Sequence, residues 1–504
     1  MARELILGVD VGTYGSKGVL CDADGRVVAS AEAEHGMDVP RPGWAEQDAD
    51  AVWWADFVRL SRELTRRLAL ADVVAAVGVS AIGPCLLPLD AAGRPLRPGI
   101  LYGVDTRASA EVDELTGRIG SAGLLRLGGM GLSSQAVGPK LLWLARHEPD
   151  VWARTRHVLT ASSYLVYRLT GELVMDTHTA SHYNPLFDLD ALAWSARYAA
   201  LVPGSDRLPR LGWPGELAGR VSAAAAEETG LRPGTPVAVG TVDAAAEALS
   251  AGVAAPGDMM LMYGTTTFFI LVTAAPVRQE GMWSTAYCLR GAYDLAAGMA
   301  TTGALTRWFR DGFARDLPGG GYAALTAEAA AAPPGSLGLV ILPYFSGERT
   351  PIQDPDARGV AAGLTLAHGR GHVYRALLEG TAYGVRHNME AIRGLGAEVR
   401  RVVAVGGGTR SRLWPQIVSD VTGETQEIPA ETTGAAYGDA FLAGWAAGLL
   451  PGLGALPAWV RPGETVAPDP DAVARYAPYY RIYRELYGAT REQCHALARL
   501  ARLE

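Results

Sequence analysis

Cysteine is scarce in this chain of 504 residues, and its four cysteines lie far apart, at Cys21, Cys85, Cys288 and Cys494. No two of them have the spacing of a redox pair or of metal ligands. The N-terminal stretch MARELILGVD reaches an acidic residue too soon for the apolar region of a signal peptide. We therefore expect a protein of the reducing cytoplasm.

An excess of positive charge is also missing. Lysine and arginine number 45 against 53 aspartates and glutamates, which gives a formal net charge of −8. This balance provides no attraction for nucleic acid or anionic lipid. Because 49% of the residues are hydrophobic and 19% are charged, the composition is globular. We expect small-molecule partners, with no nucleic acid and no membrane.

No apolar run is long and unbroken enough to span a membrane. Residues 441–460 carry no charge over a length that could cross a bilayer, but Pro451 and Pro457 interrupt them. Irregular backbone is not tolerated in lipid, so this segment predicts a buried helix that ends near Leu450, followed by a loop.

Two common nucleotide-binding motifs are absent, because the chain contains no GxxxxGK[ST] and no GxGxxG after a predicted strand. Glycine itself is abundant, at 61 residues. A nucleotide bound by glycine-rich turns would therefore need a different fold.

The first glycine turn lies in residues 6–20, ILGVDVGTYGSKGVL, where an apolar strand ends on Asp10 and a second strand follows. Gly12 and Gly15 let a ligand approach bare amides. Magnesium takes oxygen ligands and shares phosphates with one or two carboxylates, so Asp10 is a candidate magnesium ligand beside a bound anion. The turn adds donor groups from Thr13, Ser16 and Lys17. A tight hairpin with a polar edge stays open as the alternative.

A similar pattern returns in residues 258–276, where a Gly264-Thr265 turn separates two apolar strands. The chain therefore divides into two related halves. We expect an N-terminal domain of residues 1–247 and a C-terminal domain of residues 248–504. In the second half, residues 400–423 form a third pattern of strand, three glycines and helix, which suits a nucleotide.

These motifs together resemble the FGGY carbohydrate kinases. GVDVGTYGSKGVL is similar to their opening motif, KLLWLARHEP to much of their first signature, and YFSGERTPIQDPDARGVAAGLTLAH to their second. The likeness runs nearly end to end and is closest to the xylulose kinase branch. It implies an α/β, two-domain actin-like (ribonuclease H-like) ATPase fold with an interdomain cleft.

The resemblance implies transfer of the γ-phosphate of ATP to a sugar hydroxyl, with Asp243 as the general base. Such a base must lie within hydrogen-bond reach of the nucleophile. A helix N-cap is an alternative role for Asp243, and the two roles are compatible. Asp10 and Asp243 are the expected Mg²⁺ sites, partly through water. The other residues expected to bind ATP or its phosphates are Thr13, Lys17, Gly264, Thr265, Gly303, Gly407, Gly408 and Arg412.

On the sugar side the recognition loop departs from the xylulose kinase pattern, because Ile82, Gly83 and Pro84 stand where Gln, Met and His are usual. Ala244 likewise replaces the Asn that follows the catalytic Asp in those kinases. An unpaired polar group costs about 1 to 3 kcal/mol, so these losses should relax or redirect the choice of sugar. The residues that the resemblance implies for sugar binding are Trp44, Glu46, Pro84, Asp105 and Arg107.

We expect a pentulose such as D-xylulose as the acceptor, with ribulose, glycerol, erythritol and gluconate as alternatives. Two other function classes stay open, an actin-like ATPase working as a chaperone and a sugar-binding protein. The first would append a peptide-binding domain and the second would be expected to lose Asp243, which is present. The expected partners are a small sugar and ATP, and a homodimer stays an open alternative to a monomer. His178 and His182 have a metal-compatible spacing but no third ligand nearby.

Overall fold

The computed structural model describes residues 3–317, 321–430 and 433–501. They form two compact units. The first comprises Met1–Ala254, Val272–Asp294 and Thr433–Arg461, and the second comprises Ala255–Leu271, Leu295–Thr432 and Pro462–Glu504. Two segments from the second half of the sequence therefore fold with the first half. The predicted division between residues 247 and 248 stays a prediction.

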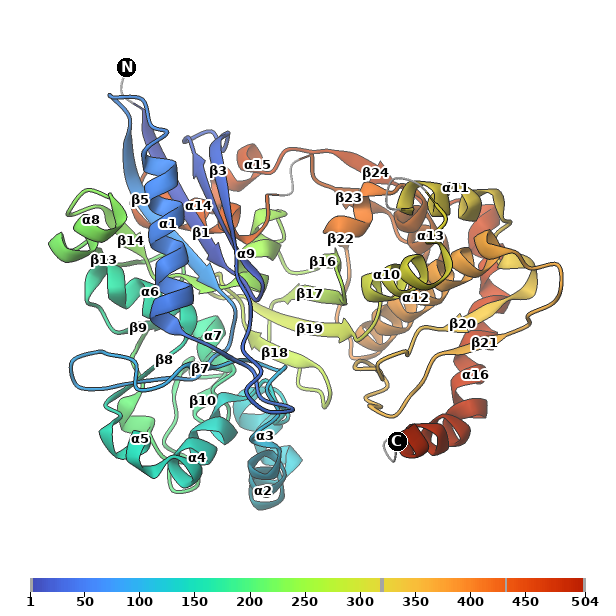
Figure 1. Ribbon diagram of the computed structural model, residues 1–504, viewed down its shortest axis with the longest axis horizontal. Coiled ribbons are helices and arrows are strands. Elements are labelled where there is room, and N and C mark those ends of the chain that lie inside the picture. The colour runs from blue at the N-terminus through green and yellow to red at the C-terminus, as the bar shows by residue number, and fades with distance from the viewer. Residues whose placement is uncertain (1–2, 318–320, 431–432, 502–504) are drawn as a thin grey trace. The chain divides into compact units, whose positions relative to one another are not determined.

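The first unit is built on a mixed sheet whose neighbouring strands follow the order β13-β14-β5-β1-β2-β3 (Figure 1). Strand β1 (Glu4–Val11) pairs antiparallel with β2 (Gly15–Cys21), and β2 pairs antiparallel with β3 (Val27–Glu34). On its other side β1 pairs parallel with β5 (Val73–Ala81). The remaining strands of this sheet are β13 (Leu217–Arg220), β14 (Pro236–Ala238) and β15 (Thr241–Val242), the last of which also pairs with β5.

Helices cover both faces of this sheet, and glycines decide how closely they approach. A Cβ on Gly8 would lie 1.9 Å from the carbonyl oxygen of Ala436, so this face of β1 touches the backbone of α14 (Ala435–Ala446). A Cβ on Gly18 would lie 2.9 Å from Leu64 in α1 (Ala55–Thr65). Gly18 is the register partner of Val9. Because successive strand residues point to opposite faces, α1 and α14 lie on opposite sides of the sheet.

The remainder of the first unit is largely helical between residues 109 and 170, with a second buried core of its own. Its helices are α2 (Ser109–Ile119), α3 (Ser121–Gly128), α4 (Val137–His147), α5 (Pro149–Arg154), α6 (Ala161–Thr170), α7 (Thr177–Ser181), α8 (Ala223–Thr229) and α9 (Asp243–Ser250). The first unit also contains short strands outside the main sheet. They are β4 (Glu46–Gln47), β6 (Leu87–Leu89), β7 (Gly99–Ile100), β8 (His157–Leu159), β9 (Val174–Asp176), β10 (Phe187–Asp188), β11 (Ala193–Trp194) and β12 (Arg210–Gly212).

The second unit repeats the hairpin that opens the chain. Strand β16 (Asp258–Tyr263) pairs antiparallel with β17 (Thr267–Thr273) and parallel with β22 (Arg401–Val405). The sheet continues through β23 (Gln426–Ile428) and β24 (Glu464–Val466). The strand–turn–strand repeat expected from the sequence is therefore confirmed. The helices of this unit are α10 (Gly303–Phe313), α11 (Tyr322–Ala331), α12 (Arg370–Gly394), α13 (Leu413–Thr422) and α16 (Pro470–Ala501).

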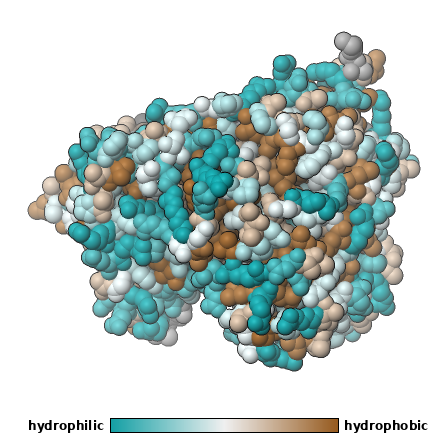
Figure 2. Space-filling model, turned by 180° about the vertical axis from the view of Figure 1, so that it is seen from behind, coloured by the Kyte–Doolittle hydropathy of each residue, from teal (hydrophilic) through white to brown (hydrophobic). Residues whose placement is uncertain are grey.

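Hydrophobic residues on the face seen in Figure 2 are scattered among hydrophilic ones. Within the described residues, none of the helices has the length and apolar character needed to cross a bilayer. The charge-free segment 441–460 is divided as expected, because α14 ends at Ala446 and the short α15 (Leu456–Trp459) follows a loop. All four cysteines are buried, and none of them forms a disulfide within the described residues.

The glycine contact with α14 generates a stability prediction. A Cβ on Gly78 of β5 would lie 2.0 Å from the carbonyl oxygen of Asp439 and 2.7 Å from its carbonyl carbon. Since both atoms belong to helix backbone, Gly78→Ala must shift α14, and we expect a loss of about 1–3 kcal/mol in the free energy of unfolding. Urea denaturation measures this change.

The matched control is Gly117→Ala on α2, where a new Cβ meets nothing within 4 Å. Alanine is the better helix former, so this variant should be neutral or more stable by up to about 1 kcal/mol. Equal destabilisation of the two variants would contradict the packing argument.

Candidate active site

Asp10 lies at the end of β1, between Ser80 on β5 and Lys17 on β2, which are its register partners. The Ser80 hydroxyl donates to Asp10 Oδ1 over 2.9 Å. Burial raises the pKa of Asp10 to about 6, although the bond from Ser80 and the charge of Lys17 oppose that rise. Lys17 itself is only 3.3 Å from Glu32, in a largely exposed ion pair.

A histidine that the sequence did not reveal, His35, contacts the turn after Asp10. His35 Nε2 donates to the carbonyl of Gly12 over 2.9 Å, and His35 Nδ1 lies 2.7 Å from the Asp56 carboxylate. Burial lowers the pKa of His35, but the bonds to Asp56 and Gly12 outweigh it and leave the pKa above its usual value. Because a carbonyl and a carboxylate can only accept, the two contacts call for a hydrogen on each ring nitrogen of His35. Ser16 also donates to Asp56, so the turn is fixed at two points.

Thr13 is oriented from another direction. Its hydroxyl lies 3.1 Å from the Tyr102 hydroxyl, and its carbonyl accepts a bond from the Gln47 amide. Tyr102 belongs to a loop whose carbonyls at Leu101 and Tyr102 both accept from the buried Lys140 ammonium. The candidate phosphate turn is thus tied to the interior of the first unit.

Asp243 is the first residue of α9 and directly follows β15. Its Oδ1 accepts from the amide of Ala244 over 2.7 Å. The N-cap position is Val242, so the alternative N-cap role of Asp243 is wrong by one residue. Burial and the negative charge of Asp10 raise the pKa of Asp243 to about 8. This carboxyl is therefore poised to hold or release a proton near neutral pH.

A third carboxyl, Glu247, lies one turn further along α9. Burial and the charge of Asp10 raise its pKa to about 7, while a bond from the Ala435 amide opposes that shift. Sequence reasoning missed Glu247, although its spacing of four residues from Asp243 puts both on one helix face.

The carboxyls of Asp10, Asp243 and Glu247 could hold a magnesium ion only together with waters and phosphate oxygens. Among the described residues, no group of three or more His, Cys, Asp or Glu side chains is arranged to hold a metal by itself. Mg²⁺ usually keeps several waters and is bound through one or two carboxylates together with phosphate oxygens. Asp10, whose charge raises the pKa of Asp243, is a carboxylate that could serve in this way. His178 and His182 belong to no such group among the described residues.

The second unit contains a cavity of about 860 Å³ that brings together predicted ATP-binding residues. Gly264, Thr265, Gly303, Gly407, Gly408 and Arg412 all line it. None of the described residues lining this cavity is acidic, and Arg307, Arg410 and Arg412 are basic. The size and the charge suit a polyanionic ligand as large as a nucleotide.

Two glycines of this cavity have no room for a side chain. A Cβ on Gly303 would lie 2.3 Å from the carbonyl oxygen of Gly264, which already accepts from the Gly303 amide. A Cβ on Gly408 would lie 2.8 Å from the side chain of Tyr263 and 2.9 Å from that of Trp414. Gly303 and Gly408 are therefore packing requirements, whereas a Cβ on Gly407 would meet nothing within 4 Å.

Arg412 lines the cavity, but 70% of its side chain is exposed, and its guanidinium lies 2.7 Å from Glu464. The sequence patterns did not single out Tyr263, Thr306, Tyr322, Tyr374 and Trp414, which line the same cavity. They come from separate helices and strands, so only the fold brings them together.

Four predicted sugar-binding residues form one network in the first unit. Arg107 Nη2 lies 2.7 Å from Asp105 Oδ2, and Arg107 Nη1 lies 2.7 Å from Glu46 Oε1. The Arg107 guanidinium also lies 4.0 Å above the ring of Trp44. Because the side chains of Asp105 and Arg107 are fully buried and paired with each other, their charges are balanced before any ligand arrives.

Pro84 follows β5 in a largely buried loop that lies against the residue before Asp243. A Cβ on Gly83 would lie 2.7 Å from Val242, the residue before Asp243. His178 is near enough for its charge to lower the pKa of Asp243. His182 is partly buried, its Nδ1 atom is buried and unpaired among the described residues, and burial together with the charge of His178 lowers its pKa to about 3.

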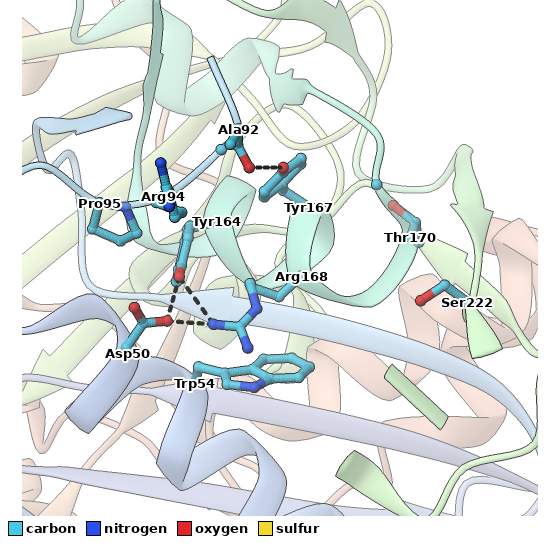
Figure 3. Close-up of a pocket in the computed structure, with 12 residues that line it drawn as sticks. Asp50, Trp54, Ala92, Arg94, Pro95, Tyr164, Tyr167, Arg168, Thr170 and Ser222 are labelled. Carbon is cyan, nitrogen blue, oxygen red and sulfur yellow. Dashed lines mark hydrogen bonds and ion pairs between the residues drawn. The ribbon is translucent and has the colours of Figure 1, made fainter. Parts of the chain in front are cut away.

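A separate cavity of about 640 Å³ in the first unit contains none of the predicted residues (Figure 3). Arg168 lies 4.5 Å from the ring of Trp54, and it contacts both Asp50 and the Tyr164 hydroxyl. Trp54 donates to Glu228 over 2.8 Å. Since these polar groups satisfy one another, we assign no ligand to this cavity.

Comparisons with known proteins identify the family of this chain. The N-terminal domain model of the FGGY family of carbohydrate kinases matches residues 5–250, and the C-terminal domain model matches residues 259–447. A xylulose kinase of Escherichia coli (strain K12) is 31% identical over 490 residues, covering 96% of this chain and 98% of the relative. A glycerol kinase of Nocardia farcinica (strain IFM 10152) is 32% identical over 472 residues, covering 89% and 91%.

Among solved structures, the crystal structure of xylulose kinase from Rhodospirillum rubrum is similar with a TM-score of 0.91. The two share 34% sequence identity, and the match covers 98% of this chain and 100% of that one. The predicted α/β, two-domain actin-like fold is therefore confirmed, and so is the predicted family. The chain belongs to the FGGY family of carbohydrate kinases, enzymes that transfer phosphate from ATP to a sugar.

Proposed function

We propose that this kinase phosphorylates a pentulose, with D-xylulose as the leading candidate, and that it works in the cytoplasm. The observation that carries the mechanism is the buried Asp243 carboxyl at the start of α9, beside Asp10 and its glycine turn. Similarity to xylulose kinases over nearly the whole chain supports the choice of sugar. Assembly into a homodimer stays open.

In this proposal the two units have different tasks. The acid-free cavity of the second unit binds ATP, with Gly303, Gly407, Gly408 and Arg412 around the adenosine and Gly264 with Thr265 at the phosphates. In the first unit Thr13 and Lys17 face the transferred phosphate. Bound Mg²⁺, held by Asp10 and Asp243 partly through water, neutralises negative charge on the phosphates.

Asp243 accepts the proton of the sugar hydroxyl as that hydroxyl attacks the phosphate. Burial and, after it, the charge of Asp10 raise the pKa of Asp243 to about 8, so pairing of Asp10 with a cation would lower it. The base is then ionised when the substrates are in place. Trp44, Glu46, Pro84, Asp105 and Arg107 orient the sugar or the loops that hold it.

Replacing the base tests the mechanism. Asp243→Asn keeps the size of the side chain and removes its basicity, so we expect kcat to fall by about 10²-fold or more. Binding of ADP, measured by calorimetry, should stay within about threefold of the wild type. Glu247→Gln is the control, because it changes a neighbouring carboxyl of α9 whose pKa is also raised. If Asp243→Asn kept more than a tenth of the wild-type kcat, the proposed base would be wrong.

A panel of acceptors tests the substrate. ADP release should require both Mg²⁺ and a sugar, and D-xylulose should give the highest kcat/KM among ketoses, polyols and aldonates. Ala244→Asn restores the amide expected in xylulose kinases. One new hydrogen bond of about 0.5–1.5 kcal/mol should raise kcat/KM for D-xylulose by about 2- to 12-fold and leave the KM for ATP unchanged. Preference for glycerol or gluconate without activity on any pentulose would refute the sugar but not the kinase.

A further inference from the structure

Asp439 is a buried acid on α14 that the proposed reaction does not use. It is 1% exposed, and its Oδ2 lies 2.7 Å from the hydroxyl of Ser80. The same hydroxyl lies 2.9 Å from Asp10 Oδ1. Ser80 therefore connects a buried acid from near the end of the sequence to the acid of the first glycine turn.

The geometry of the sheet fixes this connection. Asp10 and Ser80 are register partners, and so are Gly8 and Gly78, two residues earlier on the same strands. Both glycines face α14, and residues two apart on a strand share a face. Asp10 and Ser80 therefore also face α14. The backbone of Asp439 itself lies against Gly78, so its carboxyl has little freedom to move away.

The number of hydrogens decides the direction of these bonds. The Ser80 hydroxyl has one hydrogen and cannot donate to two carboxylates at once. One of the two acids must carry a proton and donate it to Ser80 Oγ. The Oδ1 atom of Asp439 is buried and, within the described part of the chain, has no hydrogen-bond partner. An ionised carboxylate in such a place would be far more costly than a neutral acid.

The surroundings of the two acids agree with this choice. Burial and the charge of Asp10 hold the pKa of Asp439 well above its usual value. For Asp10, by contrast, the nearby positive charges of Lys17 and His35 oppose the rise in pKa. The single hydrogen of Ser80 and the buried, unpaired Oδ1 of Asp439 therefore make Asp439 the neutral partner and Asp10 the ionised one.

We propose that Asp439 is a positioning residue for the Asp10 carboxylate. Asp439 donates to Ser80 Oγ, and Ser80 donates to Asp10 Oδ1, which leaves Asp10 Oδ2 free to meet a cation. These two hydrogen bonds fix the side-chain rotamer of Asp10 through its Oδ1 atom. This inference rests on the proposed role of Asp10 in holding Mg²⁺.

Three variants of the full chain test the proposal. Asp439→Asn keeps a donor for Ser80, so the affinity for Mn²⁺ in the presence of ADP should stay within about threefold of the wild type. Asp439→Ala and Ser80→Ala interrupt the series of hydrogen bonds from Asp439 through Ser80 to Asp10. Loss of a group that orients a metal ligand lowers the affinity for the metal by about 10- to 100-fold. Electron paramagnetic resonance of free Mn²⁺ gives these affinities. The KM for Mg²⁺ should rise in parallel, and binding of metal-free ADP should not change.

Tyr437→Phe is the matched control on the same helix. The Tyr437 hydroxyl lies 2.7 Å from the carbonyl oxygen of Gly25 and 2.9 Å from that of Trp459, and neither contact involves Ser80 or Asp439. Its removal weakens the attachment of α14 without affecting Ser80. Thermal unfolding should show a loss of stability for Tyr437→Phe, with wild-type affinity for Mn²⁺.

Two results would overturn the proposal. One is a wild-type affinity for Mn²⁺ in Ser80→Ala, and the other is an equal loss of affinity in Asp439→Asn and Asp439→Ala. The second result would mean that the site needs the charge of Asp439 and not its donor. The titration with Mn²⁺ and ADP requires no sugar, so a failure of the proposed sugar phosphorylation is detected separately.

Discussion

The direct contact of α14 with the backbones of β1 and β5 is the constraint on which the active-site geometry depends. Gly8 and Gly78 have no side chains, so the helix lies against the strands themselves. At this separation Asp439 reaches Ser80, and the amide of Ala435 reaches Glu247. A larger residue at either glycine would separate α14 from the carboxyls that it now helps to arrange. Gly8 and Gly78 thus determine both the packing of α14 and the positions of these carboxyls.

Bringing these carboxyls together is unfavourable in the absence of a cation. The pKa values of Asp10, Glu247 and Asp243 rise to about 6, 7 and 8, so the folded protein binds protons that an unfolded chain would release. The contribution of these groups to stability is fully present below their unfolded pKa values and is lost as the pH rises to about 8. Burial of the three carboxylates, together with the charge of Asp10 beside Asp243 and Glu247, therefore costs stability near neutral pH. A cation beside Asp10 would reduce that cost.

The sequence predicted the parts of the fold that depend on local patterns. Both hairpins were predictable because a glycine turn between apolar strands is a short-range signal, and β1–β2 and β16–β17 follow it. The glycine cluster at 406–408 was predictable for the same reason, since a strand and a helix flank it. The first carboxylates, Asp10 and Asp243, came from their places at strand ends together with the family resemblance. They remain predicted site residues whose roles await the measurements above.

Long-range contacts could not be predicted in this way. Ser80 and Asp439 are 359 residues apart in sequence, and nothing near either one indicates the other. The segment Thr433–Arg461 looked like part of the second half and folds with the first unit. The pairing of Arg107 with Asp105 and Glu46 also depends on the fold, although each residue had been singled out. Residue type and spacing reveal a turn, but only the completed sheet shows which side chains share a face.

The distinction between local patterns and long-range contacts also explains why phosphate binding was easier to predict from the sequence than the choice of sugar. In the proposed mechanism, phosphate binding uses backbone amides and a strand-end acid, so it would depend on turn geometry, which short motifs preserve. Sugar recognition would depend on a few polar side chains held by loops, and here Pro84 and Ala244 provide none. His178 lies near enough to Asp243 for its charge to lower the pKa of that carboxyl. The loop motif therefore does not identify the sugar, which is why the chemistry was easier to predict than the substrate.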